Sequence, residues 1–307
     1  MTPVVDRAVA LITGATGGIG FHTAVSLARA GMHVVVTGRD AARGQEAVSQ
    51  LREQAGHDGV DLILAEALSI RDNLFLAEDV MRRTGHLDVL VNNVGGAAFP
   101  ERRETPEGLE ANLALNFAGP YALTTELLRI LPVPPRRIVN VVSSAFQMWR
   151  RDPFVDLDGH RDYVALHAHA HAKLLNLLFT LALARRLADA EASVAAVNPG
   201  MAWTPGIAAL TPDAIPHWRY VWPVVRWIQR RASAASAARS VVRLAAADPV
   251  PRSGAYFDGR REKPLPAALH DPAAQDRAWA VGESLVSAAM SREIGEFRGS
   301  RLRHDGE

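Results

Sequence analysis

The sequence predicts an α/β protein whose mostly parallel sheet is covered by helices on both faces. Three observations lead to this fold class: short apolar runs alternate with longer amphipathic stretches, a glycine-rich turn follows the first run, and 48% of the 307 residues are hydrophobic. Strands and helices that alternate in this way form right-handed crossovers, which produce a doubly wound sheet. A chain this apolar can also bury a sizeable core.

The expected strands are short and apolar on both faces, which is typical of strands buried between two helix layers. In chain order they are residues 8–13, 33–37, 60–65, 87–92, 137–142, 193–197 and 254–257. The expected helices are residues 18–30, 41–55, 71–84, 107–131, 163–188 and 233–247. The first three helices are each followed at once by a glycine. Glycine most readily takes the left-handed conformation that ends a helix.

No internal repeat and no linker divides the chain, so we expect a single Rossmann-type domain over residues 1–296. Residues 203–232 contain four tryptophans and several prolines, and we expect a helical substrate lid there. Such rings favour a large, flat or apolar ligand, but they could also pack against the core or a partner subunit. Residues 297–307 are expected to form a polar, frayed tail.

The composition excludes several classes of protein. The chain has no cysteine, which excludes disulfides, thiolate metal sites and cysteine nucleophiles. A net charge of +1 with both signs interspersed gives no bulk attraction to nucleic acid. The first ten residues lack the pattern of a secretory signal, and no apolar run approaches the roughly 18 residues of a membrane span. We therefore expect a cytoplasmic protein without a metal, a nucleic-acid partner or a membrane span.

A glycine-rich turn joins the first expected strand to the first expected helix. Its sequence is Thr13-Gly14-Ala15-Thr16-Gly17-Gly18-Ile19-Gly20. At such a turn, backbone N–H groups and the positive end of the helix can bind a pyrophosphate. We expect the turn to bind a dinucleotide through Gly14, Thr16, Gly18, Ile19 and Gly20. The alternative is a tight turn that binds no ligand.

The second expected strand ends at Thr37-Gly38-Arg39-Asp40, where a dinucleotide places its adenosine ribose. Arg39 would pair with a 2′-phosphate through its planar guanidinium, whereas a carboxylate there would repel it. Asp40 comes one residue later and is expected to cap the next helix. These residues predict a preference for NADP(H), unless Arg39 is only a solvated loop residue.

Further motifs occur in the order and spacing of a known family. They are Asn92-Asn93-Val94-Gly95, Leu115-Asn116-Phe117, Ser143-Ser144, Lys173-Leu174-Leu175-Asn176 and Asn198-Pro199-Gly200. Together with the glycine-rich turn they resemble the short-chain dehydrogenases/reductases. Details such as Thr37-Gly38-Arg39-Asp40 resemble the retinol-dehydrogenase-like branch. The resemblance runs from about Val9 to Met290, nearly the whole chain.

The resemblance implies further cofactor contacts. Asn93 and Gly95 would lie against the adenosine and ribose. Pro199 and Gly200 would shape the loop beside the nicotinamide, and Thr204 would contact the nicotinamide amide.

The resemblance also implies catalytic roles. Ser144 would donate a hydrogen bond to a substrate carbonyl, Lys173 would hold the ribose, and Asn116 would hold a water molecule in a proton path. From the residues alone, Ser144 could instead be a turn or capping serine. Asn116 could instead be a buried amide satisfied by the backbone.

The sequence departs from the family pattern at the catalytic tyrosine. The family has Tyr-x-x-x-Lys on the helix after the fifth strand, and here His169 stands four residues before Lys173. The i, i+4 spacing puts both side chains on one helix face. The neighbouring ammonium would lower the pKa of His169 below its usual 6.5, which leaves a neutral imidazole with little capacity to give a proton. Tyr163 is a replacement donor only if the helix begins late enough to bring it to the centre.

We therefore expect an atypical NADPH-dependent reductase that transfers hydride to the carbonyl of a bulky apolar or polycyclic substrate, polyketide-like compounds included. His169, or an acidic group of the substrate, would supply the proton. The alternative is an NADP(H)-binding protein of the same fold without redox turnover, either a non-redox catalyst such as a cyclase or a sensor or scaffold. Helix pairing between subunits is common in the family, which leaves a homo-oligomer open.

Overall fold

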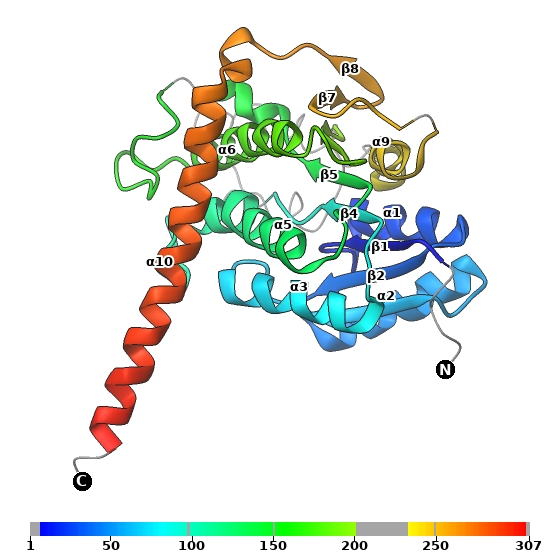
Figure 1. Ribbon diagram of the computed structural model, residues 1–307, viewed down its shortest axis with the longest axis horizontal. Helices are drawn as coiled ribbons and strands as arrows, with labels where there is room; N and C mark the ends of the chain where they lie inside the picture. The colour runs from blue at the N-terminus through cyan, green and yellow to red at the C-terminus, as the bar shows by residue number, and fades with distance from the viewer. Residues whose placement is uncertain (1–6, 97–98, 150, 201–232, 249, 305–307) are drawn as a thin grey trace.

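The computed structural model describes residues 7–96, 99–149, 151–200, 233–248 and 250–304 (Figure 1). Within these ranges one sheet has the strand order β3-β2-β1-β4-β5-β6-β7-β8, and only β7 and β8 are antiparallel neighbours. The strands are β1 (Val9–Ile12), β2 (His33–Gly38), β3 (Val60–Leu64), β4 (Val89–Asn92), β5 (Arg137–Val141), β6 (Ser193–Asn198), β7 (Ala255–Asp258) and β8 (Arg261–Lys263). This order confirms the predicted doubly wound, mostly parallel fold.

Helices cover both faces of the sheet (Figure 1). One layer contains α1 (Gly18–Arg29), α2 (Ala41–Ala55) and α9 (Ala234–Ala246), and the other contains α3 (Ile70–Thr84), α5 (Gly119–Ile130) and α6 (Ala165–Arg186). Each layer packs its own apolar cluster against the sheet. Strands β1 and β4 are fully buried between the layers, as their apolar sequences require.

The helix ends follow the capping residues of the sequence. Asp40 is the N-cap of α2, and its Oδ1 accepts a hydrogen bond from the Arg43 N–H at 2.8 Å. This confirms the capping role expected for Asp40. Gly56 and Gly85 end α2 and α3 with φ values of 77° and 72°, the left-handed conformation that glycine takes without strain.

The long helix predicted over residues 107–131 is interrupted. The chain forms a short helix α4 (Ala111–Leu113), a π-helical turn η1 (Ala114–Ala118) and then α5. Glu110 begins this segment, because its carboxylate accepts hydrogen bonds from the Asn112 and Leu113 N–H groups at 2.9 and 2.8 Å. A π turn adds one residue to the helical repeat and often marks a functional site. Asn116 lies within it.

The C-terminal part holds elements that the sequence did not lead us to predict. Strand β8 is followed by the 3-10 turn η5 (Ala267–His270) and by helix α10 (Pro272–His304), which packs mainly on α6 (Figure 1). Trp279 of α10 lies 5.4 Å from the ring centre of Tyr121 and 5.8 Å from that of Phe179. The boundary predicted at residue 297 falls inside this helix. The predicted lid, residues 203–232, lies outside the described residues.

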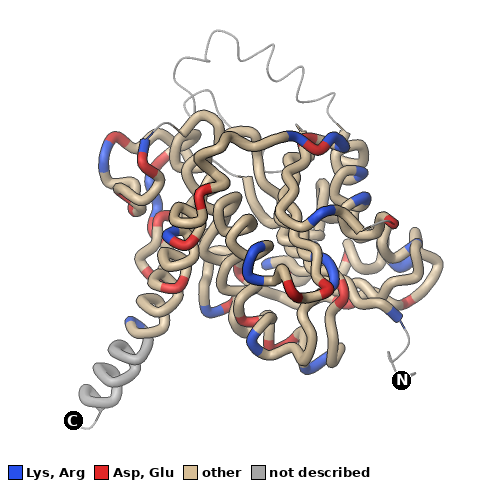
Figure 2. The backbone as a smooth tube through the Cα atoms, turned by 45° about the horizontal axis from the view of Figure 1, so that its top comes forward, with Lys and Arg blue, Asp and Glu red and all other residues tan. Residues whose placement is uncertain are grey.

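Positive and negative residues are interspersed over the described part of the chain (Figure 2). None of the described helices is long and apolar enough to span a bilayer. The glycine-rich turn and the ends of β4, β5 and β6 all lie at the carboxyl edge of the sheet. In open α/β sheets this is the edge at which ligands bind.

Candidate active site

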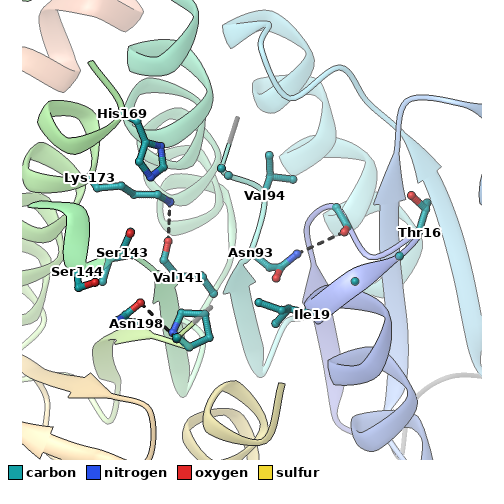
Figure 3. Close-up of a pocket in the computed structure, with 18 of the residues that line it drawn as sticks. Thr16, Ile19, Asn93, Val94, Val141, Ser143, Ser144, His169, Lys173 and Asn198 are labelled. Atoms are coloured by element: carbon teal, nitrogen blue, oxygen red, sulfur yellow. Dashed lines mark hydrogen bonds between the residues drawn. The ribbon is translucent and has the colours of Figure 1, made fainter. Parts of the chain in front are cut away.

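One cleft at the carboxyl edge of the sheet brings together most of the residues selected from the sequence (Figure 3). Those that line it are Gly14, Thr16, Gly18, Ile19, Asn93, Gly95, Ser144, His169, Lys173, Pro199 and Gly200. Three others, Gly20, Arg39 and Asn116, are not part of this lining. Thr204 falls outside the described residues. The cleft therefore joins the glycine-rich turn to the candidate catalytic residues of α6 and β5.

The glycine-rich turn contains two residues in the left-handed backbone conformation that favours glycine. Gly14 and Gly18 have φ values of 64° and 59°. A Cβ atom on Gly20 would stand 2.8 Å from the Gly14 main-chain oxygen, so Gly20 acts by close packing beneath the turn. The Asn93 side chain donates from Nδ2 to the Thr13 and Gly14 oxygens at 2.8 and 3.3 Å. Asn93 thus fixes the turn as well as lining the cleft.

Two arginines stand near the end of β2, and they differ in position. Arg39 is 75% exposed at its side chain and lies 4.0 Å from the Glu66 carboxylate. Arg43, in the first turn of α2, lines the cleft, and its Nη2 is 3.2 Å from the position of a Cβ on Gly17. Sequence reasoning missed Arg43. No motif marks Arg43, because Arg39 precedes α2 and the i, i+4 rule therefore does not relate the two arginines.

Lys173 is buried at the centre of the cleft wall. Its Nζ donates to the main-chain oxygen of Val141 at 2.8 Å, which ties α6 to the end of β5 (Figure 3). Removal from water lowers the pKa of Lys173 to about 7. A Cβ atom on Gly95 would stand only 2.7 Å from this Nζ, so the absence of a side chain at Gly95 keeps the approach to the lysine open.

His169 lies one helical turn before Lys173 and lines the same cleft (Figure 3). Its side chain is buried, and desolvation together with the Lys173 charge lowers the pKa of His169 to about 3. The imidazole is therefore neutral at neutral pH, as the i, i+4 spacing led us to expect. Its buried Nδ1 has no hydrogen-bond partner among the described residues.

Two adjacent serines follow β5: one caps the next turn, and the other faces the cleft. Ser143 caps the 3-10 turn η2 (Ser144–Met148), because its Oγ accepts from the Ala145 N–H at 3.2 Å. Ser144 is exposed toward the cleft and makes no side-chain hydrogen bond to the described residues. The capping role that was the alternative for Ser144 therefore belongs to Ser143. The Ser144 hydroxyl is available to a ligand.

Asn116 lies behind the cleft and is fully buried. Its Oδ1 accepts from the Gly96 N–H at 3.1 Å, and its Nδ2 donates to the Asn112 oxygen at 3.0 Å. The main-chain oxygen of Asn116 accepts from Asn176 Nδ2 at 2.6 Å. These contacts match the structural alternative for Asn116, a buried amide satisfied by its surroundings.

Tyr163 does not reach the cleft. It precedes the first residue of α6, Ala165, and its hydroxyl donates to the Phe99 oxygen at 2.9 Å and accepts from Asn112 Nδ2 at 3.0 Å. Burial raises the pKa of Tyr163 to about 12. The hydroxyl lines a second cavity, so the replacement donor considered from the sequence is absent from the Lys173 site.

This arrangement defines a nucleotide-binding α/β enzyme: a glycine turn at a helix N-terminus faces a buried lysine across one cleft. The family model for short chain dehydrogenases matches residues 8–214. The chain belongs to that family, whose members are oxidoreductases that bind a nicotinamide cofactor and act on small molecules. The described residues fit such a cofactor, because side chains at Gly14, Gly20 or Gly95 would fill or distort the cleft.

The curated relatives include retinol dehydrogenases. Retinol dehydrogenase 14 of Mus musculus is 33% identical over 288 residues, which cover 90% of this chain and 85% of the relative. Retinol dehydrogenase 12 of Homo sapiens is 34% identical over 291 residues, covering 91% and 86%. These matches agree with the branch that the sequence motifs resemble.

Solved structures share the fold over most of the chain. An uncharacterised protein from Mycobacterium paratuberculosis is 27% identical with a TM-score of 0.70 and covers 93% of this chain and 97% of its own. A variant of actinorhodin polyketide ketoreductase, solved with NADPH, is 26% identical with a TM-score of 0.65 and covers 84% and 97%.

Proposed function

We propose that this chain is an NADPH-dependent reductase that transfers hydride to the carbonyl of a bulky apolar or polycyclic substrate, polyketide-like compounds included. The observation that carries the proposal is the single cleft in which the glycine-rich turn faces Ser144, His169 and Lys173. One relative is named as a retinol dehydrogenase and one similar solved structure as a polyketide ketoreductase, which supports the proposed substrate class.

The preference for NADPH rests on the arginines after β2. Arg43 lines the cleft at the glycine-rich turn, and Arg39 stands on the preceding loop with most of its side chain exposed. Guanidinium groups pair with phosphate through two parallel hydrogen bonds. Both arginines would hold the 2′-phosphate, and Arg43 would contribute more because it already borders the cleft.

Three side chains of the cleft have a part in the proposed reaction. The reduced nicotinamide supplies the hydride when bound. Ser144 donates its hydroxyl to the substrate carbonyl, and Lys173 binds the ribose and adds positive charge where the carbonyl oxygen gains negative charge. His169 stands where the family has its tyrosine acid and presents a neutral imidazole that can polarise a carbonyl by hydrogen bonding.

The lowered pKa of His169, about 3, also favours a second function, in which the protein binds the cofactor without redox turnover. An imidazole that stays neutral holds no readily released proton, so the cleft could bind NADP(H) without reducing a ketone. In that case the chain would act as a cofactor-assisted non-redox catalyst, for example a cyclase, or as a sensor or scaffold.

NADPH binding and NADPH oxidation separate these functions. Calorimetric titration should give a dissociation constant for NADPH at least about 10-fold below that for NADH. Arg43→Ala should lose most of this preference, Arg39→Ala less, and the matched surface control Arg82→Ala none. Steady-state NADPH oxidation with a panel of aromatic ketones should show turnover. NADPH that binds with this preference but is never oxidised would favour the non-redox function.

A further inference from the structure

The cleft contains a nitrogen that the described residues leave unpaired. His169 is 9% exposed, and its Nδ1 is buried without a hydrogen-bond partner among those residues. An unpaired buried polar atom destabilises the folded protein, and such atoms are uncommon in native proteins. His169 also borders the cleft next to Lys173 (Figure 3), so a ligand in the cleft can meet its imidazole ring.

No other ionisable group of the described cleft lining forms a hydrogen bond with His169 Nδ1. Apart from His169, the charged or titratable side chains among its described lining residues are Arg43 and Lys173. Arg43 stands at the glycine-rich turn. Lys173 Nζ is directed to the Val141 oxygen at 2.8 Å, and no hydrogen bond joins it to His169. A relay from the ammonium through the imidazole is therefore not formed in this structure.

The described tyrosines also stand elsewhere. Tyr121 and Tyr256 are buried in the hydrophobic core, and Tyr163 is bonded to Phe99 and Asn112 away from the cleft. The fourth tyrosine, Tyr220, lies outside the described residues and is included in the test below. The described lining thus offers a hydrogen-bonding imidazole but neither a phenol nor a carboxyl group to protonate an alkoxide.

We propose that the substrate carries an acidic hydroxyl next to its carbonyl, phenolic or enolic, and that this hydroxyl supplies the proton that a tyrosine would otherwise give. The inference rests on the proposed reductase function. His169 donates its ring N–H to the hydroxyl oxygen, and Ser144 donates to the carbonyl oxygen. The hydroxyl proton then stays free to pass to the carbonyl, and the same N–H stabilises the phenolate or enolate that remains.

The chemistry balances with the groups named. The carbonyl carbon gains hydride from the reduced cofactor, and the C=O electron pair moves onto the oxygen. That oxygen takes the proton of the adjacent hydroxyl, which becomes a phenolate or enolate. Solvent then returns a proton to this anion, so one ketone, one NADPH and one proton give one alcohol and one NADP⁺.

A matched pair of ketones tests the inference. Wild type is assayed for NADPH oxidation with ortho-hydroxybenzophenone and with ortho-methoxybenzophenone, which lacks only the acidic proton. A positioned general acid contributes about 100-fold to 10,000-fold. We expect wild-type kcat/KM to be at least about 100-fold higher for the hydroxy compound. In His169→Tyr the protein regains its own acid, and the two compounds should react within about 10-fold of each other.

Equal rates for the two ketones in wild type would overturn the inference and leave the reductase function intact. If those equal rates collapsed in Tyr220→Phe, the proton donor would be Tyr220 and the inference would again fail. A different result, no NADPH oxidation by wild type or His169→Tyr with either ketone, would contradict the reductase function itself.

A binding measurement gives a readout without turnover. In the presence of NADP⁺, wild type should bind the hydroxy compound about 10-fold more tightly than the methoxy compound, because the methyl group of the methoxy compound keeps its oxygen away from the His169 N–H. His169→Phe keeps a ring of similar size but has no nitrogen, and it should lose this preference. If the preference is unchanged in His169→Phe, the hydroxyl does not meet this side chain.

Discussion

Lys173 on α6 donates a hydrogen bond from Nζ to the main-chain oxygen of Val141 at the end of β5, over 2.8 Å. This contact places an amine in a site from which water is excluded. Burial lowers the pKa of Lys173 from 10.5 to about 7. Between these two values the unfolded chain binds a proton that the folded chain does not. The free energy of unfolding therefore rises as the pH rises from 7 toward 10.5.

Lys173→Met removes the buried amine and keeps a chain of similar length. We expect the variant to be more stable than wild type at pH 7.5, by about 1–4 kcal/mol from the size of the shift. The advantage should narrow at pH 9.5. Urea unfolding at both pH values measures this, and Lys263→Met, a change at an exposed lysine of β8, serves as control. A variant that is less stable by the same amount at both pH values would show that the amine carries no burial penalty.

The lowered pKa of His169 predicts that the folded protein loses stability in acid. Its pKa is about 3 in the folded protein against 6.5 ordinarily, so between these values only the unfolded chain is protonated. Stability is full above pH 6.5 and falls as the pH decreases, by at most about 1.4 kcal/mol per pH unit for one proton. The thermal midpoint of wild type should fall more steeply from pH 7 to pH 5 than that of His169→Phe. Parallel curves for the two proteins would refute this, and His270→Phe, at an exposed histidine, should retain the wild-type slope.

The close packing of Gly20 beneath the glycine-rich turn predicts that no side chain is tolerated at this position. A Cβ atom there would stand 2.8 Å from the Gly14 oxygen and 2.9 Å from the Ala15 Cα, both backbone atoms that cannot move without distorting the turn. Gly20→Ala should cost about 1–3 kcal/mol of stability and weaken NADPH binding. Gly17→Ala is the control for stability, because its Cβ would meet only the flexible end of Arg43. Equal unfolding free energies for the two variants would contradict the packing argument.

Trp279 predicts that α10 stabilises the domain. Its ring packs on Tyr121 and Phe179, and the Arg186 guanidinium lies 4.2 Å above it. Trp279→Ala should lower the free energy of unfolding by about 3 kcal/mol. Asp276→Ala, which removes exposed ion pairs with Arg185 and Arg186, should cost less than about 1 kcal/mol. If the tryptophan variant unfolds at the same urea concentration as wild type, α10 does not contribute to global stability.

Local patterns in the sequence were sufficient for most of the fold. Buried apolar runs identified seven of the strands, and glycines marked the ends of α2 and α3. These features depend on neighbours within a few residues. Strand β8 escaped prediction because its three residues, Arg261–Lys263, are polar, exposed and paired only at the sheet edge.

The sequence analysis did not predict the π turn at Asn116 or helix α10, because both depend on tertiary packing. The π turn at Asn116 follows from side-chain bonds to Gly96 and from Asn176 Nδ2, which come from distant parts of the chain. Helix α10 has charged residues throughout, so its apolar periodicity is weak in the sequence, although Ala278, Trp279 and Leu285 pack against the core.

The sequence motifs anticipated which residues lie together at the candidate site, but not how far each side chain reaches. The glycine turn, Ser144, His169 and Lys173 converge as their motifs imply. Arg39 was selected by its place after β2, yet Arg43 borders the cleft, because the first turn of α2 directs it there. The direction of an arginine side chain is not encoded in the spacing of its neighbours.

The docking of α10 also has a consequence for biosynthesis. Tyr121 and Phe179 complete their aromatic contacts only with Trp279, a residue made about a hundred positions after Phe179. A nascent chain that has emerged only as far as β7 would expose these rings to water and to other polypeptides. Ribosome-bound intermediates of this length should therefore bind chaperones until synthesis passes α10.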